Sequence, residues 1–124
     1  MLITLYIAAF LAITVGFAHS ILGERYILTR LFRRDDLPKL FGSSEFTTRT
    51  LRFAWHITTI AWWGFSALLI QLAQGAIPTR GVALVIAITF LATAVVACAG
   101  SRARHLAWPV FLFIGVAALY AALT

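Results

Sequence analysis

Four long stretches without a charged side chain constrain this chain more than any other feature. They lie before Glu24, between Arg52 and Arg80, between Arg80 and Arg102, and from His105 onward. A helix needs about 20 mostly apolar residues to cross a bilayer, so each stretch has room for one crossing helix and none has room for two. The sequence therefore predicts four transmembrane helices, at approximately residues 2–22, 52–73, 81–100 and 105–123.

Composition supports this fold class and excludes others. Hydrophobic residues make up 62% of the chain and charged residues 11%, whereas about a quarter of the residues in soluble domains are charged. The apolar runs also lack the short alternating segments of a membrane barrel. Short links between the windows favour antiparallel neighbours. We predict an all-α membrane protein in which residues 1–124 form a single four-helix bundle.

The basic residues predict how this bundle sits in the membrane. Four spans place residues 23–50 and the turn near residue 102 on one side, where nine of the ten basic residues gather. Basic residues mark the cytoplasmic side. We therefore expect loop 23–50 to be cytoplasmic and both termini to lie outside, in a bacterial inner membrane. The net charge of +6 is then a topology signal that also attracts anionic lipid; the bilayer is the expected partner and nucleic acid is not.

Loop 23–50 has recognisable organisation of its own. Residues 20–34 can continue the first helix as an amphipathic segment at the membrane interface. Pro38 then disfavours helix at the preceding residue. Gly42-Ser43-Ser44 supplies a second break and an N-cap, so the next helix is predicted to begin near Glu45.

Three histidines are the main candidates for chemistry. The topology brings His19, His56 and His105 to a similar depth near the cytoplasmic interface, and Glu24 follows His19 by about one turn. Neutral imidazole is a common ligand of zinc, copper and iron. The sequence therefore suggests a transition-metal or haem site. The competing interpretation is that each histidine only hydrogen-bonds a carbonyl or a lipid headgroup at the interface.

A polar stripe and a basic rim are the other candidate features. The second span places Thr59, Trp63 and Ser66 on the same helical face as His56, and polar residues in membrane helices usually face the interior. These three residues are therefore predicted to line a pocket. The basic rim could instead bind a lipid phosphate or an acidic metabolite; it consists of Arg49, Arg52, Arg102 and Arg104.

These features leave three function classes open, and they do not decide whether the protein is an enzyme. The first is a cofactor-binding protein built on the histidines. The second is a non-catalytic scaffold, a homo-oligomer or an accessory subunit of a larger membrane complex, with loop 23–50 docking a partner. The third is a binder of anionic lipid or an acidic ligand. No acidic residue falls within a predicted span, which argues against a proton-coupled drug exporter.

One short segment resembles a known family. The run His19-Ser20-Ile21-Leu22-Gly23-Glu24-Arg25 resembles the His-x-x-x-Gly-x-Arg element of succinate dehydrogenase membrane anchors. The resemblance covers seven residues, and those anchors usually have three spans where this chain is predicted to have four. It implies a neighbourhood of haem and quinone, with no activity of this chain alone.

Overall fold

The computed structural model describes residues 2–75 and 78–124. Its main elements are α1 (Leu2–Leu22), α3 (Glu45–Ala73), α4 (Thr79–Ser101) and α5 (Ala107–Leu123). A π-helical segment, η1 (Gly23–Leu28), and the short α2 (Thr29–Leu31) continue α1, so that one helix runs from Leu2 to Leu31. The predicted all-helical architecture and the continuation of the first helix into loop 23–50 are confirmed.

Three of these helices are long and apolar enough to cross a membrane: Leu2–Leu31, Glu45–Ala73 and Thr79–Ser101. The fourth predicted span is shorter than expected. Helix α5 begins at Ala107 and has 17 residues, which give a length of about 25 Å against ~30 Å of hydrocarbon. The chain between α4 and α5 turns through left-handed backbone at Arg102 and Ala103, and this turn delays the start of α5.

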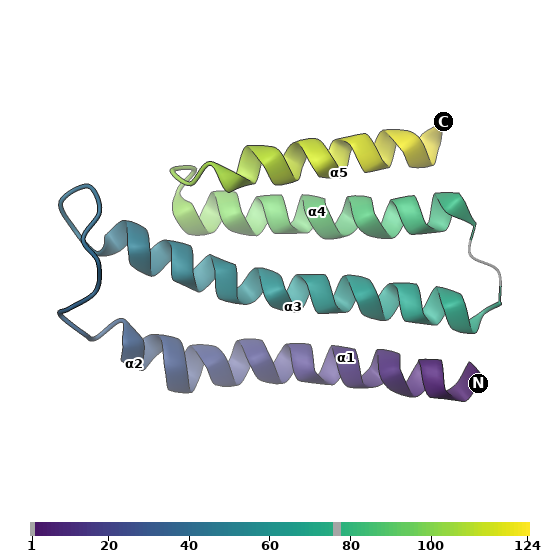
Figure 1. Ribbon diagram of the computed structural model, residues 1–124, viewed down its shortest axis with the longest axis horizontal. Coiled ribbons are helices and arrows are strands. Elements are labelled where there is room, and N and C mark those ends of the chain that lie inside the picture. Colours follow the sequence, from purple (N-terminus) through teal and green to yellow (C-terminus); the bar gives the residue numbers. More distant parts are fainter. Residues whose placement is uncertain (1, 76–77) are drawn as a thin grey trace.

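The long helices stand side by side in one row, in the order α1, α3, α4, α5 (Figure 1). Within the described residues, α1 packs on α3, α3 on α4, and α4 on α5, and α1 has no packing contact with α4 or α5. The predicted closed bundle is therefore replaced by an open layer. The start of α1 and the end of α5 lie at one end of the parallel helix axes, and the connection between α2 and α3 lies at the other end (Figure 1).

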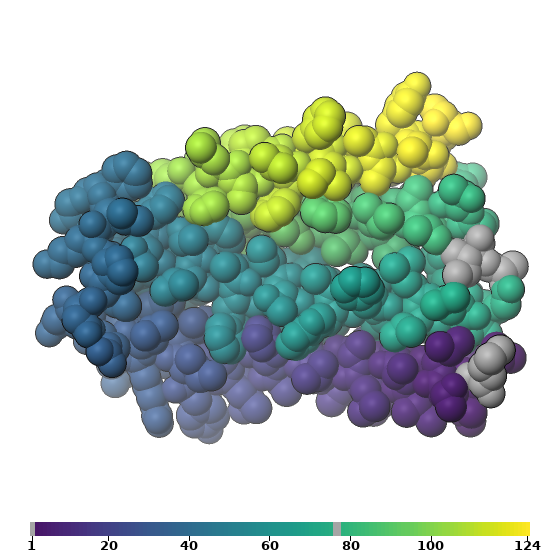
Figure 2. Space-filling view, in the orientation of Figure 1, coloured from purple at the N-terminus to yellow at the C-terminus, as the bar shows by residue number. Residues whose placement is uncertain are grey.

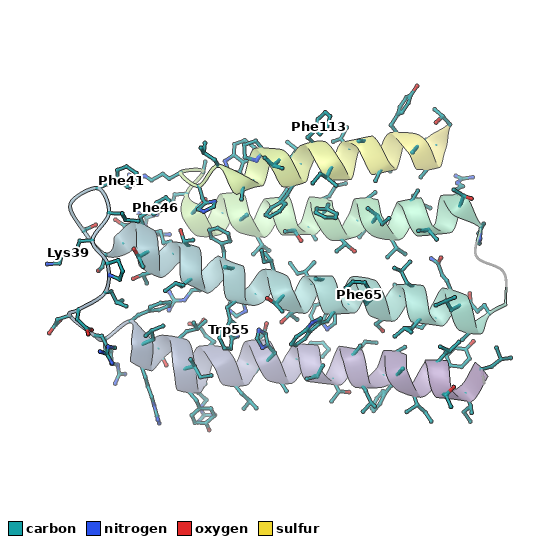
Figure 3. The ribbon with its side chains drawn as sticks, in the orientation of Figure 1. Lys39, Phe41, Phe46, Trp55, Phe65 and Phe113 are labelled. Atoms are coloured by element: carbon teal, nitrogen blue, oxygen red, sulfur yellow. The ribbon has the colours of Figure 1, made fainter. Side chains whose placement is uncertain are left out.

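Small residues let neighbouring helices approach closely. A Cβ atom on Gly16 would lie 2.5 Å from the Trp63 indole nitrogen, one on Gly64 would lie 2.5 Å from the Thr89 hydroxyl, and one on Gly115 would lie 2.8 Å from Leu91. Apolar burial drives little association within lipid, so such close packing is a main source of stability. The outer faces remain covered with apolar side chains, and Phe65 and Phe113 are among the exposed ones (Figures 2 and 3).

The connection between α2 and α3 is held by local hydrogen bonds. Arg34 donates two hydrogen bonds to the Asp36 carboxylate, at 2.8 and 2.6 Å, and this interaction lowers the pKa of Asp36. The Thr47 hydroxyl donates to the carbonyl of Pro38 at 2.8 Å. Helix α3 begins at Glu45 as predicted. The Ser44 side chain makes no capping bond, and the Ser43 hydroxyl accepts the Glu45 N–H at 3.3 Å.

The other two connections also differ in detail from the sequence prediction. Helix α4 continues through Ser101 before it turns, one residue beyond the predicted end of the third span. Residues 76 and 77 of the predicted external turn lie outside the described residues.

Candidate functional site

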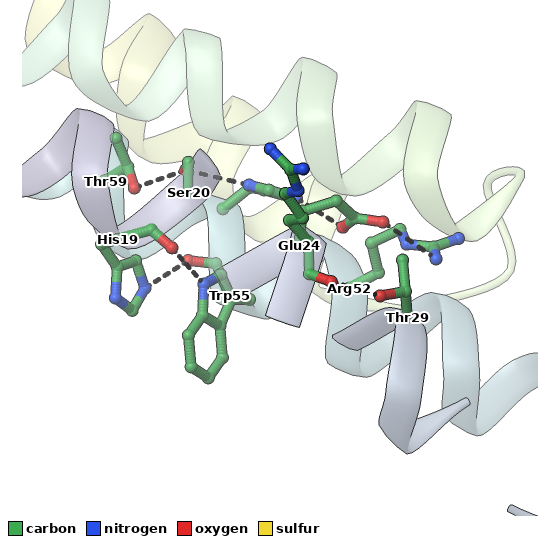
Figure 4. Close-up of polar contacts among 9 residues, drawn as sticks. His19, Ser20, Glu24, Thr29, Arg52, Trp55 and Thr59 are labelled. Atoms are coloured by element: carbon green, nitrogen blue, oxygen red, sulfur yellow. Dashed lines mark hydrogen bonds and ion pairs between the residues drawn. The ribbon is translucent and has the colours of Figure 1, made fainter. Parts of the chain in front are cut away.

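A polar cluster joins α1 and η1 to α3, near the helix ends that the α2–α3 connection links (Figure 4). The Ser20 hydroxyl lies 2.9 Å from Nδ1 of His56. The Glu24 carboxylate lies 3.2 Å from Nε2 of the same imidazole. The Ser20 hydroxyl also lies 2.7 Å from that of Thr59, which lies 3.2 Å from the Gly16 carbonyl. His56 is thus held at both ring nitrogens by residues one turn apart.

The π-helical segment brings Glu24 and its neighbours against α3. Gly23 opens this segment, and a Cβ atom there would lie 2.2 Å from the Trp55 indole nitrogen. The indole N–H of Trp55 donates to the carbonyl of His19 at 2.9 Å. Single-turn π-helices often occur at functional sites. Here the segment lets an indole ring pack directly on the backbone beside Glu24.

Arginines surround the two carboxylates of this region. Nη2 of Arg52 lies 3.0 Å from Glu24, and the Arg52 guanidinium lies over the ring of Phe32 at 4.9 Å. Glu45 accepts from Arg49 at 3.0 Å and from Arg102 at 3.1 Å. Arg104 also acts electrostatically on Glu45. Four arginine charges therefore face two carboxylate charges, so the region keeps an excess of positive charge.

A cleft of about 540 Å³ opens beside this cluster, between α3 and α4. Its α3 wall carries the charged or titratable side chains of Glu45, Arg49, Arg52 and His56, and its α4 wall has no polar side chain. The Arg49 and Arg52 side chains are 29% and 46% exposed, so neither is sealed within the protein. Arg49 also donates from Nη1 to the Gly100 carbonyl at 3.3 Å. A guanidinium has five N–H donors, so other donors of Arg49 and Arg52 remain for an anion.

A separate apolar cleft of about 450 Å³ lies farther along the same two helices and shares no lining residue with the basic cleft. On α3, His56 lines the basic cleft, and Ile60, Trp63 and Ala67 follow it in the lining of the apolar cleft. On α4, Val96 lines the basic cleft, and Ala92 and Ile88 line the apolar cleft. Residues three or four apart lie on one helix face, so the two clefts occupy the same side of the α3–α4 contact. We call these two aligned clefts the α3–α4 groove. The cleft at Arg49 and Arg52 is its basic head, and the cleft at Ile60 and Trp63 is its apolar tail.

A second apolar cleft, of about 480 Å³, is also lined by α3 and α4. Its α3 wall steps through Ala54, Thr58, Ala61, Phe65 and Leu68, a different face of the helix from that of the α3–α4 groove. The Thr58 hydroxyl donates to a carbonyl of its own helix. This cleft has no charged side chain in its lining.

The structure separates the three predicted histidine ligands. The His19 ring stacks on Trp55 with ring centroids 4.4 Å apart, and its Nε2 lies 3.2 Å from the Trp55 carbonyl. His105 packs against Phe46 and Phe53, and its Nδ1 accepts the Ala107 N–H at 3.1 Å. Only Glu24 and His56 of the proposed ligand set meet. Residues 2–75 and 78–124 contain no group of three or more histidine, cysteine or acidic side chains placed to hold a metal ion.

The predicted pocket-lining stripe divides between two environments. Trp63 lines the apolar part of the α3–α4 groove, and its indole N–H donates to the carbonyl of Ile13 at 3.3 Å. Thr59 and Ser66 are instead buried against α1, where Ser66 donates to the Ala9 carbonyl at 2.9 Å. These two hydroxyls fasten α1 to α3 and line none of the clefts described above.

Ser20 is the hydrogen-bonding side chain of the cluster that was not among the predicted site residues. Its position one turn before Glu24 on the same helix was the available signal. The order Ser20, His56, Glu24 has the connectivity of a hydrolase triad. Ser20, however, lies within a helix whose N–H groups bond along the helix, so the adjacent backbone offers no oxyanion hole. The cluster is better suited to binding than to acyl transfer.

No family model matches this chain, and neither a curated protein nor a solved structure is similar to it. The resemblance to succinate dehydrogenase anchors remains confined to its seven residues. Function must therefore be inferred from the geometry of the α3–α4 groove and the cluster beside it.

Proposed function

We propose that this protein binds an anionic amphiphile, with a phosphate headgroup at Arg49 and Arg52 and an apolar tail along the rest of the α3–α4 groove. The observation that carries the proposal is the alignment of a basic cleft and an apolar cleft along one face of α3 and α4. The shared ligand chemistry is a phosphate on a long hydrocarbon chain.

The charge distribution favours an anion at the head of the groove. Both nearby carboxylates are already ion-paired with arginines, Glu24 with Arg52 and Glu45 with Arg49 and Arg102. Their negative charge is therefore largely compensated, and the remaining guanidinium N–H groups can bind phosphate oxygens. Charge-assisted bonds of this kind are about twice as strong as neutral ones.

The tail part of the groove favours hydrocarbon over a polar ligand. Among its lining residues, Ile60, Ile88 and Ala92 offer no polar side-chain atom, and the Thr89 hydroxyl donates to the carbonyl of Val85. A water-soluble acidic metabolite would use only the head of the groove, whereas an amphiphile would use its whole length. This difference favours an amphiphile.

The proposal is tested by measuring ligand binding to the full chain in neutral detergent by native mass spectrometry. We expect saturable binding of phosphatidic acid or of an isoprenyl phosphate and weaker binding of phosphatidylcholine. Phosphatidic acid has two acyl chains and an isoprenyl phosphate has one chain, so their relative affinities show whether the site prefers a two-tailed or a single-tailed amphiphile. Arg52→Gln should weaken binding of the anionic ligand about tenfold.

Arg30→Gln is the matched control. It removes the same charge, but Arg30 lies over the ring of Tyr26 and is absent from the lining of the groove. Equal effects of Arg52→Gln and Arg30→Gln, or equal binding of phosphatidic acid and phosphatidylcholine, would show that only general charge attraction operates.

A further inference from the structure

The hydrogen-bonded line through His56 has two complete arrangements that differ by one proton. The line runs from Glu24 through His56 and Ser20 to Thr59 and the Gly16 carbonyl, with successive separations of 3.2, 2.9, 2.7 and 3.2 Å. Every member except the two ends can both donate and accept, because a hydroxyl and a neutral imidazole each do both.

With neutral His56, Nε2–H donates to the Glu24 carboxylate, so Nδ1 must accept. The Ser20 hydroxyl then donates to Nδ1, and the Thr59 hydroxyl donates to Ser20. The Gly16 carbonyl then serves only as an acceptor within its own helix, α1. In this arrangement the proton of each hydroxyl points toward His56.

With protonated His56, all of these bonds except the one to Glu24 reverse. Nδ1–H donates to Ser20, Ser20 donates to Thr59, and Thr59 donates to the Gly16 carbonyl at 3.2 Å. No donor loses its acceptor, and the added positive charge lies beside the Glu24 carboxylate. The line can therefore take up one proton without moving a heavy atom.

The charged groups around His56 determine what that proton does to the groove. Glu24 faces the ring from η1, and Arg52, Arg49 and Glu45 precede it on α3 along the lining of the groove. Glu45 is paired with Arg49 and Arg102. The α4 side offers only Val96, Ala99 and Gly100. With neutral His56, Glu24 and Arg52 compensate each other; protonation leaves an additional positive charge at the head of the groove.

We infer that His56 is a proton-binding site coupled to occupancy of the α3–α4 groove, so that an anionic amphiphile binds more tightly when His56 is protonated. The inference rests on the proposed function and adds its regulation. Coupling is reciprocal, so the bound anion must also favour protonation of His56. A unit charge about 6 Å away at an effective dielectric constant of about 40 changes affinity about tenfold.

The test is a histidine side-chain NMR titration of the full chain in neutral detergent between pH 5 and 8. The probe is short-chain phosphatidylglycerol, whose phosphodiester charge is constant over this range, with phosphatidylcholine of the same chain length for comparison. We expect saturating phosphatidylglycerol to raise the titration midpoint of His56 by about one pH unit. His19 and His105 serve as internal controls and should not shift, since neither is in the lining of the groove.

Two further results separate the possible failures. If phosphatidylglycerol binds but the His56 midpoint does not move, the coupling is wrong and the proposed function stands. If no anionic amphiphile binds, the proposed function and the coupling both fail. The hydrogen-bonded line is tested without ligand: Ser20→Ala should change the His56 midpoint, because Nδ1 loses its partner in both arrangements, and Thr59→Ser, which keeps a hydroxyl, should leave it near that of the wild type. An unchanged midpoint in Ser20→Ala would show that the line does not hold the proton.

Discussion

Gly23 and Trp55 show how much of the site depends on single residues that carry no charge. The indole packs where a Cβ atom of residue 23 would stand, and its N–H donates to the His19 carbonyl. The sequence identified His19, Glu24 and His56 because charged and ligating residues stand out in an apolar chain. It could not identify the Gly23–Trp55 contact, because close packing between helices leaves no pattern within either helix.

Gly23→Ala should therefore destabilise the protein by about 1–3 kcal/mol, since the added methyl group has no space beside Trp55. The measurement is the free energy of unfolding in detergent micelles. In the Trp55→Leu background the smaller side chain leaves room, and the same substitution should cost much less. Equal costs in both backgrounds would contradict the assigned contact.

The helices themselves were largely predictable, and their packing was not. Charge-free windows and breaks at Pro38 and Gly42 placed the elements well, and α3 begins at Glu45 as predicted. The sequence did not predict the π-helical form of Gly23–Leu28, because hydrogen-bond register within a helix is set by tertiary contacts. The expectation that the three histidines share one depth in the membrane stays a prediction, and the sequence did not show which side of a helix each histidine faces.

Helix α5 offers the clearest test of packing at this scale, because among the described helices it packs only on α4. Gly115→Leu should push α5 away, since even a Cβ atom there would lie 2.8 Å from the Leu91 side chain and 3.0 Å from its backbone nitrogen. We expect a loss of about 1–3 kcal/mol in unfolding free energy. Phe113→Leu, on the exposed side of α5, should change stability little. A comparable loss in both variants would contradict the assigned face.

The open row of helices is a property of the whole chain that its sequence did not reveal. The apolar windows are hydrophobic on all sides, so their pattern does not indicate whether the helices form a closed bundle or a flat layer. In lipid, both faces of a layer are solvated by hydrocarbon, and exposed side chains such as Phe65 and Phe113 carry no penalty. In a bilayer, such an open layer would leave the α3–α4 groove accessible from the lipid.

Orientation in the membrane is predicted from the same charges that line the head of the groove. With Cys98, the one native cysteine, replaced by alanine, Lys39→Cys should react with a membrane-impermeant maleimide only from the cytoplasmic side. Gln74→Cys, at the opposite end of α3, should react only from outside. The physical reason is the concentration of basic residues at the end that carries Lys39. The reverse pattern of labelling would overturn the predicted orientation.

The most direct test of the central claim is to locate the tail of a bound amphiphile. A phosphatidic acid carrying a photoreactive diazirine in its acyl chain, crosslinked to the full chain and mapped by mass spectrometry, should label Ile60, Trp63, Ile88 and Ala92, which line the α3–α4 groove. An excess of unlabelled phosphatidic acid should suppress this labelling, and phosphatidylcholine should not. Equal labelling of Phe65 and Phe90, in the other apolar cleft, or labelling that phosphatidic acid does not suppress, would contradict the claim that the groove is an amphiphile site.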